Sequence, residues 1–393
     1  MATMASLPVL ILLPIALQTA TLSLTQVMPA SAFAAASRRR VSLVTGANGY
    51  LGREIVSQLL SEQQQEPKYE DEMLDDEVIC LVREHRVEDE KKYWDGYSSR
   101  CKVTVMPYDM LDNGESLSEA LDYVYQGIGS LDQLCNIYHV ASVFGPTENH
   151  KETALENIKG SEDVVKVVSR YGSGCQNTPT CIVTSSMAAV RATNQKPKNG
   201  KWYTHEDWNT ESQLGANWGQ SYQWSKAQAE RRCWALAKEL EVSMVSLCPS
   251  FVFGPPSGGM ATNSYSIQLV GQWIRGHGEV QSRLCVDVRD VAKAHIEAGR
   301  RPSAIGQRFI ISTESRLSST VTAEVLKRAS AGVGLVSGAV EILCDTNFDG
   351  GAIKIGEREV DCERRMQNEL GVVCRSTEET MKDMAIALLQ VEN

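Results

Sequence analysis

The sequence lacks the residue patterns of metal sites and nucleic-acid interfaces. No two of its 11 cysteines form a C-x-x-C pair and its 6 histidines are scattered, so no segment has the ligand spacing of a zinc site. Basic residues are also in deficit, because 39 Lys and Arg face 49 Asp and Glu for a formal net charge of -10. A nucleic-acid-binding domain shows clustered Lys and Arg instead. We therefore predict no metal and no nucleic-acid partner, and we expect a small-molecule ligand.

Apolar runs of membrane-spanning length are missing as well. The run Leu7 to Leu17 is too short for a bilayer, which takes about 20 residues, so we predict no transmembrane segment in the mature protein. The same run suits the core of a signal peptide, and Ala30-Ser31-Ala32 supplies a small-residue cleavage pattern. Arg38-Arg39-Arg40 then closes a stretch without acids, although no Lys or Arg precedes the apolar run. Residues 1–40 are therefore interpreted as a targeting presequence.

The string Ala30-Ser31-Ala32-Phe33-Ala34 resembles the two-part presequence of algae with secondary plastids. In those presequences a signal peptide is cut just before a Phe that starts a transit peptide. The resemblance implies a plastid of secondary origin as the destination. An ordinary signal for the endoplasmic reticulum and secretory pathway, or a mispredicted start, remains open as an alternative.

After Val41 short apolar runs alternate with longer amphipathic segments, which is typical of a parallel sheet with crossover helices. We predict a doubly wound α/β domain over residues 41–250, a late strand at 308–312 that returns to it, and a smaller lobe over 251–393 that mainly binds substrate. The acid-rich stretch Glu66 to Glu77 is interpreted as a solvated insertion. Cys80, Cys135, Cys181 and Cys248 lie inside apolar runs, which favours reduced core thiols. The expected strands are Val41–Thr45, Val78–Arg83, Lys102–Tyr108, Leu134–Ala141, Thr180–Ser185, Val242–Cys248 and Arg308–Ser312, and the expected helices are Leu51–Gln63, Leu117–Tyr125, Leu155–Arg170, Tyr222–Leu240 and one near Ile267–Arg275.

The first strand and helix enclose a glycine turn, Thr45-Gly46-Ala47-Asn48-Gly49-Tyr50-Leu51-Gly52. In a unit of this kind the first glycine makes the tight turn, the second lets the backbone approach a pyrophosphate, and the third lets the helix pack closely on the strand. The phosphates then lie at the positive helix N-terminus. The G-x-x-G-x-x-G spacing differs from the commoner G-x-G-x-x-G, so its meaning depends on the rest of the chain.

Two residue pairs could carry acid–base chemistry. Tyr222 and Lys226 are four residues apart and share one helix face. A free Tyr has a pKa of about 10, so it needs a nearby cation to act near neutral pH. Ser185 and Ser186 end a strand 36 residues upstream of Tyr222, at the sheet edge where ligands bind, and a hydroxyl there could hold a substrate carbonyl.

In their order along the chain these motifs resemble those of the extended short-chain dehydrogenase/reductases, within the NAD-dependent epimerase/dehydratase superfamily. The likeness is strongest to the branch that holds dihydroflavonol reductases and cinnamoyl-CoA reductases. It runs from about Val41 to the C-terminus. The motifs that carry it are Thr45-Gly46-x-x-Gly49-x-x-Gly52, His139-Val140-Ala141-Ser142, Thr184-Ser185-Ser186, Tyr222-x-x-Ser225-Lys226, Pro249-x-x-Val252-x-Gly254-Pro255, Val286-Asp287-Val288-Arg289-Asp290 and Arg308-Phe309-Ile310-Ile311-Ser312.

The resemblance implies a role for each matching residue. Ser186, rather than Ser185, would polarise the substrate carbonyl, Tyr222 would donate the proton, and Lys226 would bind the nicotinamide ribose and lower the pKa of the tyrosine. Asn157 matches an asparagine that in many relatives holds a proton-relaying water, with helix packing as its alternative role. The implied cofactor-binding residues, on a Rossmann domain, are Gly46, Asn48, Gly49, Tyr50, Leu51, Arg83, Asp109, Met110, Val140, Ala141, Ser142, Tyr222, Lys226, Pro249, Ser250, Phe251 and Val252.

The end of the second strand bears on the choice of cofactor. An acid there accepts the ribose 2′-hydroxyl of NAD, whereas an arginine pairs with the 2′-phosphate of NADP. Arg83 ends this strand and matches the arginine of NADP-dependent relatives, while Glu84 follows it. We therefore expect NADP(H).

The expected function is the NADPH-dependent reduction of an aldehyde or ketone by a Ser/Tyr/Lys mechanism. The alternatives are a nucleotide-sugar epimerase or dehydratase with bound NAD, and a dinucleotide-sensing protein without turnover. Trp208 matches a loop anchor of the relatives, whereas Trp202 and Trp218 are open between core packing and pocket lining. Substrate identity and oligomeric state, a homodimer included, stay open.

Overall fold

The computed structural model describes residues 40–61, 75–97, 101–126, 134–172, 179–259, 264–332, 342–343 and 356–391. The presequence predicted over residues 1–40, apart from Arg40, lies outside the described residues, as does most of the predicted acidic insertion. Residues Arg39–Asn393 form one compact unit. The fold of that unit follows.

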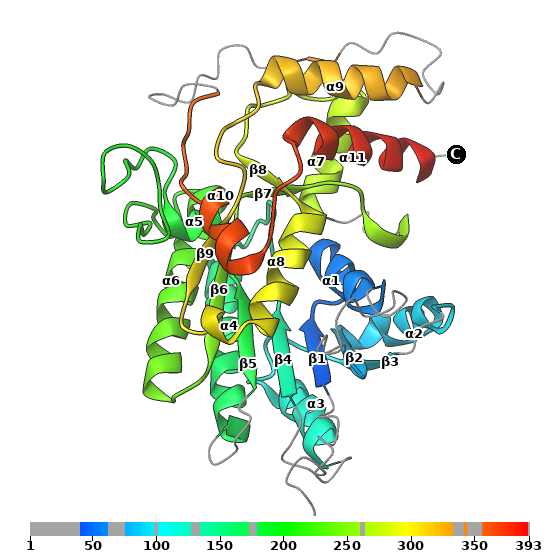
Figure 1. The fold of residues 1–393 in the computed structure, drawn as a ribbon, viewed down its shortest axis with the longest axis vertical. Helices are drawn as coiled ribbons and strands as arrows, with labels where there is room; N and C mark the ends of the chain where they lie inside the picture. Colours follow the sequence, from blue (N-terminus) through cyan, green and yellow to red (C-terminus); the bar gives the residue numbers. More distant parts are fainter. Residues whose placement is uncertain are drawn as a thin grey trace, which may run out of the picture. The chain divides into compact units, whose positions relative to one another are not determined.

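Within the described residues, seven strands form a fully parallel sheet in the order β3-β2-β1-β4-β5-β6-β9 (Figure 1). The chain runs outward from β1 to β3 and then returns to β4 on the other side of β1. This reversal opens a crevice at the carboxyl ends of β1 and β4, where doubly wound sheets bind ligands. The predicted doubly wound α/β fold is confirmed. The strands are β1 Arg40–Thr45, β2 Glu77–Val82, β3 Lys102–Pro107, β4 Leu134–His139, β5 Thr180–Thr184, β6 Met244–Pro249 and β9 Arg308–Ile311.

Helices cover both faces of the sheet because the strand side chains alternate between two apolar cores. In β1, Leu43 packs into one core and Val44 into the other. The core that contains Val44 takes α1 and α8, whereas the core that contains Leu43 takes α3, α4 and α6. Cys80, Cys181 and Cys248 are buried and free, as expected. These helices are α1 Tyr50–Ser61, α3 Glu115–Gln126, α4 His150–Gly172, α6 Trp218–Glu239 and α8 Val288–Arg300.

A third apolar core belongs to the C-terminal lobe. There α7, α9 and α11 pack around a short parallel pair, β7 with β8, and they lie together at the top of Figure 1. The bounds in this lobe are β7 Phe251–Phe253, α7 Tyr265–Ile274, β8 Cys285–Asp287, α9 Ser319–Gly332 and α11 Thr377–Val391. The remaining elements are η3 Glu84–Arg86, α2 Val87–Asp95, α5 Met187–Val190, η4 Ser257–Gly259, η5 Pro302–Ala304, α10 Glu363–Arg365 and η6 Met366–Leu370.

Several boundaries differ from the expected ones. The helix expected from Tyr222 begins at Trp218, because the side chain of Asn217 accepts the N–H of Gln220 (2.9 Å) and caps a turn that was not expected. Tyr222 therefore lies one turn inside the helix. Likewise α4 begins at His150 and not at Leu155. Helices α2 and α8 were not predicted, and α8 packs on α1 beside the sheet although its residues follow the strand expected to end the first domain.

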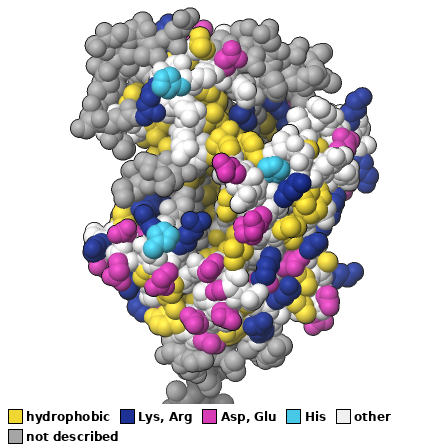
Figure 2. Space-filling view, turned by 180° about the vertical axis from the view of Figure 1, so that it is seen from behind, with side chains coloured by type: hydrophobic (Ala, Val, Ile, Leu, Met, Phe, Trp, Pro, Cys, Tyr) yellow, Lys and Arg dark blue, Asp and Glu magenta, His cyan; other side chains and the backbone are white. Residues whose placement is uncertain are grey.

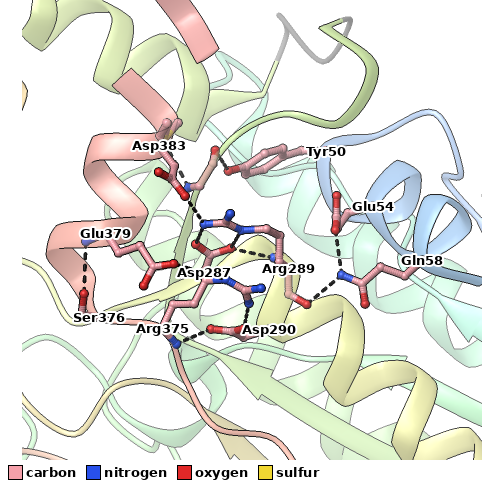
Figure 3. A network of polar contacts seen from close by, with 12 residues as sticks. Tyr50, Glu54, Gln58, Asp287, Arg289, Asp290, Arg375, Ser376, Glu379 and Asp383 are labelled. Atoms are coloured by element: carbon pink, nitrogen blue, oxygen red, sulfur yellow. Dashed lines mark hydrogen bonds and ion pairs between the residues drawn. The ribbon is translucent and has the colours of Figure 1, made fainter. Parts of the chain in front are cut away.

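A polar network ties the C-terminal lobe to the first helix (Figure 3). Arg289 pairs with Asp287 (2.7 Å) and with Asp383 of α11 (2.9 Å), and its carbonyl accepts a hydrogen bond from Gln58 of α1 (2.9 Å). The Tyr50 hydroxyl donates to the carbonyl of Gly254 (2.6 Å), so the glycine turn is bound directly to the segment after β7. The C-terminal lobe is therefore bound to the glycine turn and to α1 beside the crevice.

On the face shown in Figure 2, acidic and basic side chains are interspersed, and the described residues form no large patch of one charge sign there. Among the described residues, none of the helices combines the length and the apolar composition that a membrane span needs.

Candidate active site

The glycine turn has the geometry that its sequence predicts. Gly46 adopts φ +66°, and its N–H donates to the carbonyl of Leu81 in β2 (2.9 Å). A Cβ on Gly52 would collide with the carbonyl of Gly46, so the first turn of α1 packs on the loop only because Gly52 has no side chain. A Cβ on Gly49 would lie 3.1 Å from the same carbonyl. The N-terminus of α1 is thus held open toward the crevice.

A cleft of about 1690 Å³ follows the carboxyl edge of the sheet from this turn to α6 and the C-terminal lobe. It brings together nearly all of the predicted site residues, although they come from widely separated segments. Asn157 is the predicted residue outside its lining. Those that line it are Gly46, Asn48, Gly49, Tyr50, Leu51, Arg83, Asp109, Met110, Val140, Ala141, Ser142, Ser186, Tyr222, Lys226, Pro249, Ser250, Phe251 and Val252.

Asn157 acts on the loop after β4. Its Oδ1 accepts the N–H of Val143 (2.9 Å) and its Nδ2 donates to the carbonyl of Val143 (3.0 Å). This two-way bond fixes the segment that the resemblance places beside the nicotinamide. The water-relay role of Asn157 stays a prediction.

His139 fixes the start of that same loop. Thr45 Oγ1 accepts the N–H groups of Val140 and Ala141 (both 3.1 Å) and lies 3.0 Å from Nδ1 of His139. Burial and the nearby charge of Lys226 lower the pKa of His139 to about 3, so the ring is neutral. A neutral ring with its proton on Nε2 accepts the Thr45 hydroxyl at Nδ1 and donates to Ser161 (3.3 Å), which satisfies the whole set. Apart from the motif itself, nothing in the sequence pointed to this role of His139.

The end of β2 presents positive charge to the cleft. Arg83 is exposed and stands just before η3, and Arg86 at the end of η3 is half-buried and also lines the cleft. Glu84 lies between them and is exposed. Sequence reasoning found Arg83 but missed Arg86, which only the turn of η3 brings to the same wall.

Tyr222 and Lys226 project from α6 into the cleft one turn apart. Burial raises the pKa of Tyr222 to about 12, against a hydrogen bond with Ser186 that lowers it. Burial lowers the pKa of Lys226 to about 8, although the Glu230 carboxylate opposes that shift. Lys226 donates to the carbonyl of Thr184 at the end of β5 (2.9 Å). At neutral pH Tyr222 is therefore a neutral hydroxyl and Lys226 is a cation. The expected lowering of the Tyr222 pKa by Lys226 is not found here, because burial raises that pKa.

The two serines after β5 have different partners. Ser185 donates to the buried carboxylate of Glu230 (2.7 Å) and is committed to the core. Ser186 caps α5, where its Oγ accepts the N–H of Ala188 (3.1 Å), and it contacts Tyr222. The hydroxyl of Ser186 is therefore beside Tyr222 in the cleft, and its contact with the ligand stays a prediction.

Glu230 and Arg308 form a buried ion pair next to Ser185. Arg308 Nε lies 2.7 Å from Glu230, and the pair is buried, with 7% and 1% of the side chains exposed. Glu230 also accepts hydrogen bonds from Ser246 of β6 and Ser185. The guanidinium of Arg308 stacks on Trp208 (3.8 Å to the ring centre), which fits the loop-anchor role expected for that tryptophan.

Aromatic rings form the wall of the cleft that faces Tyr222. Phe144 lies 4.8 Å from Tyr222 and 5.8 Å from Phe251, measured between ring centres. Tyr265 and Trp218 complete the wall, so Trp218 lines the pocket. Trp202 instead lies away from the cleft, against the Arg358 guanidinium (4.9 Å). The wall suits a substrate with an apolar body.

Comparisons with known proteins agree with this geometry. A family model described as male sterility protein, an NAD-binding family, matches residues 44–287. The NADPH-dependent methylglyoxal reductase GRE2 of Saccharomyces cerevisiae is 24% identical over 373 residues, which cover 89% of this chain and 98% of the relative. The cinnamoyl-CoA reductase CAD2 of Medicago truncatula is 28% identical over 293 residues, 72% of this chain and 78% of the relative.

The fold has close counterparts as well. The structure of yeast Gre2 complexed with NADPH superposes with a TM-score of 0.68 at 23% identity, and it covers 90% of this chain and 99% of that one. The match to the family model spans more than half of the chain. The chain therefore belongs to the extended short-chain dehydrogenase/reductases, in the NAD-binding family described as male sterility protein.

Proposed function

We propose that the protein is an NADPH-dependent reductase of an aldehyde or ketone that works through Ser186, Tyr222 and Lys226. The observation that carries the proposal is the meeting of these three side chains in one cleft with the glycine turn. The reductase class and the NADPH cofactor agree with the similar proteins of yeast and Medicago. The Ser/Tyr/Lys mechanism is inferred from the geometry.

The cleft has the features that a dinucleotide requires. The glycine turn is free of side chains at Gly46 and Gly49, and α1 begins directly after it, so that phosphates could bind at the positive N-terminus of this helix. Arg83 and Arg86 would hold a 2′-phosphate, and the backbone of residues 140–142 and 249–252 would flank the nicotinamide. When bound, NADPH supplies the hydride that reduces the carbonyl carbon.

The side chains supply the proton and the charge stabilisation. The Ser186 hydroxyl donates a hydrogen bond to the carbonyl oxygen as negative charge develops there. The Tyr222 hydroxyl then transfers its proton to that oxygen. Lys226 stabilises the tyrosinate left behind, because its ammonium lies one turn away in a site where burial strengthens the attraction. The Thr184 carbonyl holds Lys226 in place for this role.

Consumption of NADPH tests the proposal directly. Protein begun near Ser37 should oxidise NADPH in the presence of at least one member of a panel of aldehydes, ketones, acyl-CoA thioesters and sterols. A purified protein that retains NAD and ignores NADPH would support an epimerase or dehydratase instead. NADPH binding without turnover of any compound would support a sensing role.

The cofactor preference is testable at the end of β2. The change Arg83→Ala should weaken NADPH binding by about tenfold or more and leave NADH binding nearly unchanged, because a charge-assisted contact with the 2′-phosphate is lost. Fluorescence titration with both cofactors measures this. Glu84→Gln is the matched control, because it removes a negative charge from the same strand end. It should not reduce the preference for NADPH over NADH. An equal loss for both cofactors in Arg83→Ala would show that Arg83 does not read the 2′-phosphate.

A further inference from the structure

We infer that the substrate carries a carboxylate at a distance from its carbonyl group, and that Arg283 binds this carboxylate at the far end of the aromatic wall. The inference rests on the proposed reductase function. It concerns the part of the cleft that the glycine turn and the Ser/Tyr/Lys residues leave open.

Arg283 is a half-buried cation with few partners among the described residues. It stands two residues before β8, lines the cleft, and donates from Nη2 to the side chain of Gln281 (2.7 Å). Its Nε is buried without a hydrogen-bond partner, and within the described part of the chain no carboxylate pairs with it. Burial and the neighbouring charge of Arg316 lower the pKa of Arg283, so its surroundings disfavour the cation that it carries. Of its donors, Nη1 is neither buried nor bonded within the described residues, so the guanidinium has a donor open for an anion.

Two further arginines increase the positive charge of this wall. Arg191 and Arg316 both line the cleft, and both pair with Glu359, at 3.1 Å and 2.6 Å. One carboxylate therefore serves two guanidiniums while Arg283 has none among the described residues. Arg191 closes α5, the short helix that Ser186 opens, so this charge is rigidly connected to the carbonyl-binding end.

The segments that carry the arginines are joined by backbone contacts and by one hydrogen bond of the Arg316 side chain. Arg283 forms an isolated bridge with Leu317, and the Arg316 side chain donates to the carbonyl of Ser282 (3.3 Å). Glu359 N–H in turn donates to the carbonyl of Glu314 (2.8 Å). The excess of positive charge is therefore built into the fold at this place.

The position of Arg283 defines the kind of substrate. Its guanidinium lies over the ring of Phe251 (4.6 Å to the ring centre), and Phe251 leads through Phe144 to Tyr222. An anion at Arg283 is thus separated from the reacting carbonyl by the length of the aromatic wall. A planar carboxylate fits the fork of a single guanidinium, and the rings would cover the apolar part of the molecule. The expected class is an oxo-carboxylic acid with an aromatic or aliphatic spacer.

Ligand binding tests the arginine site without turnover. The full chain saturated with NADP⁺ is titrated calorimetrically with benzoate and with benzamide, its neutral counterpart. We expect benzoate to bind about tenfold more tightly or better, and this preference to fall below about twofold in Arg283→Gln. Arg358→Gln is the matched control, since Arg358 lies on Trp202 outside the cleft, and it should keep the preference. Equal affinity for benzoate and benzamide, or tighter binding of inorganic phosphate than of benzoate, would overturn the inference.

Turnover separates the inference from the proposed function. The ratio of kcat/KM for 4-carboxybenzaldehyde over its methyl ester should be about ten or more in the wild type and should collapse in Arg283→Gln, as the charge-assisted contact is lost. A ratio near one with both compounds reduced would overturn the carboxylate site and leave the reductase intact. Selective benzoate binding with no aldehyde reduced would overturn the reductase and retain the arginine site.

Discussion

Replacing Tyr222 by Phe should lower kcat/KM for carbonyl reduction by about 10²- to 10⁴-fold, the usual contribution of a positioned general acid. The substitution removes the hydroxyl that donates the proton in the proposed mechanism, and it keeps the ring that packs on Phe144. NADPH affinity should change little, because the phosphate-binding turn and the end of β2 are untouched. Steady-state rates with the best substrate of the panel, together with cofactor titration, measure both effects. Near-normal rates and normal NADPH binding in Tyr222→Phe would contradict the proposed mechanism.

The pH dependence of the wild-type rate tests the partner of Tyr222. Lys226 has a pKa lowered to about 8, so it is charged at neutral pH and loses its proton as the pH rises through that value. The ammonium stabilises the tyrosinate, and kcat/KM for reduction should therefore be level near neutral pH and decline above about pH 8. In Lys226→Met the rate should be low and this decline should disappear. If the rate of Lys226→Met declined with the same midpoint pH, the decline would have to come from another group.

The sequence predicted the fold and the common helix face of Tyr222 and Lys226 because both depend on local spacing. The glycine turn occupies eight consecutive residues, and four residues along a helix suffice to put Tyr222 and Lys226 on one face. The alternation of apolar runs predicted the strands in the same way, since a parallel strand is buried on both faces and its side chains are apolar throughout. These parts of the structure need no knowledge of distant contacts.

The rest depends on contacts between segments far apart in the chain. Arg283 and Arg191 are ordinary charged residues in the sequence, and only the fold brings them to one wall of the cleft. There Arg191 pairs with Glu359, whereas Arg283 pairs with no carboxylate of the described residues. Helix α2 was missed because its apolar residues, Val87 and Trp94, lie seven apart among charged neighbours. Arg308 was recognised in a motif, but its buried partner Glu230 lies 78 residues away.

That pair leads to the largest expected effect on stability. Arg308→Leu should lower the free energy of unfolding by about 3–5 kcal/mol, because it leaves the Glu230 carboxylate buried without its cation. Urea unfolding followed by fluorescence measures the loss. Arg358→Leu is the control, since Arg358 pairs with Glu314 in a more exposed setting and should cost less than about 1 kcal/mol. Equal losses of stability in the two variants would show that burial does not increase the contribution of the Glu230–Arg308 pair.

The pH dependence of that loss identifies its cause. In the wild type burial alone would raise the pKa of Glu230, but the charge of Arg308 and the hydrogen bonds from Arg308, Ser246 and Ser185 outweigh it and lower the pKa. The pair therefore stabilises the fold above the unfolded pKa of a glutamate, about 4.3, and this stabilisation is lost on further acidification. In Arg308→Leu only the hydrogen bonds from Ser246 and Ser185 still oppose burial, the largest effect on this carboxyl, so Glu230 should bind its proton more tightly in the folded state than in the unfolded chain. The difference in unfolding free energy between the variant and the wild type should therefore shrink as the pH falls from about 8 to about 5. A packing defect alone would give the same difference at both pH values.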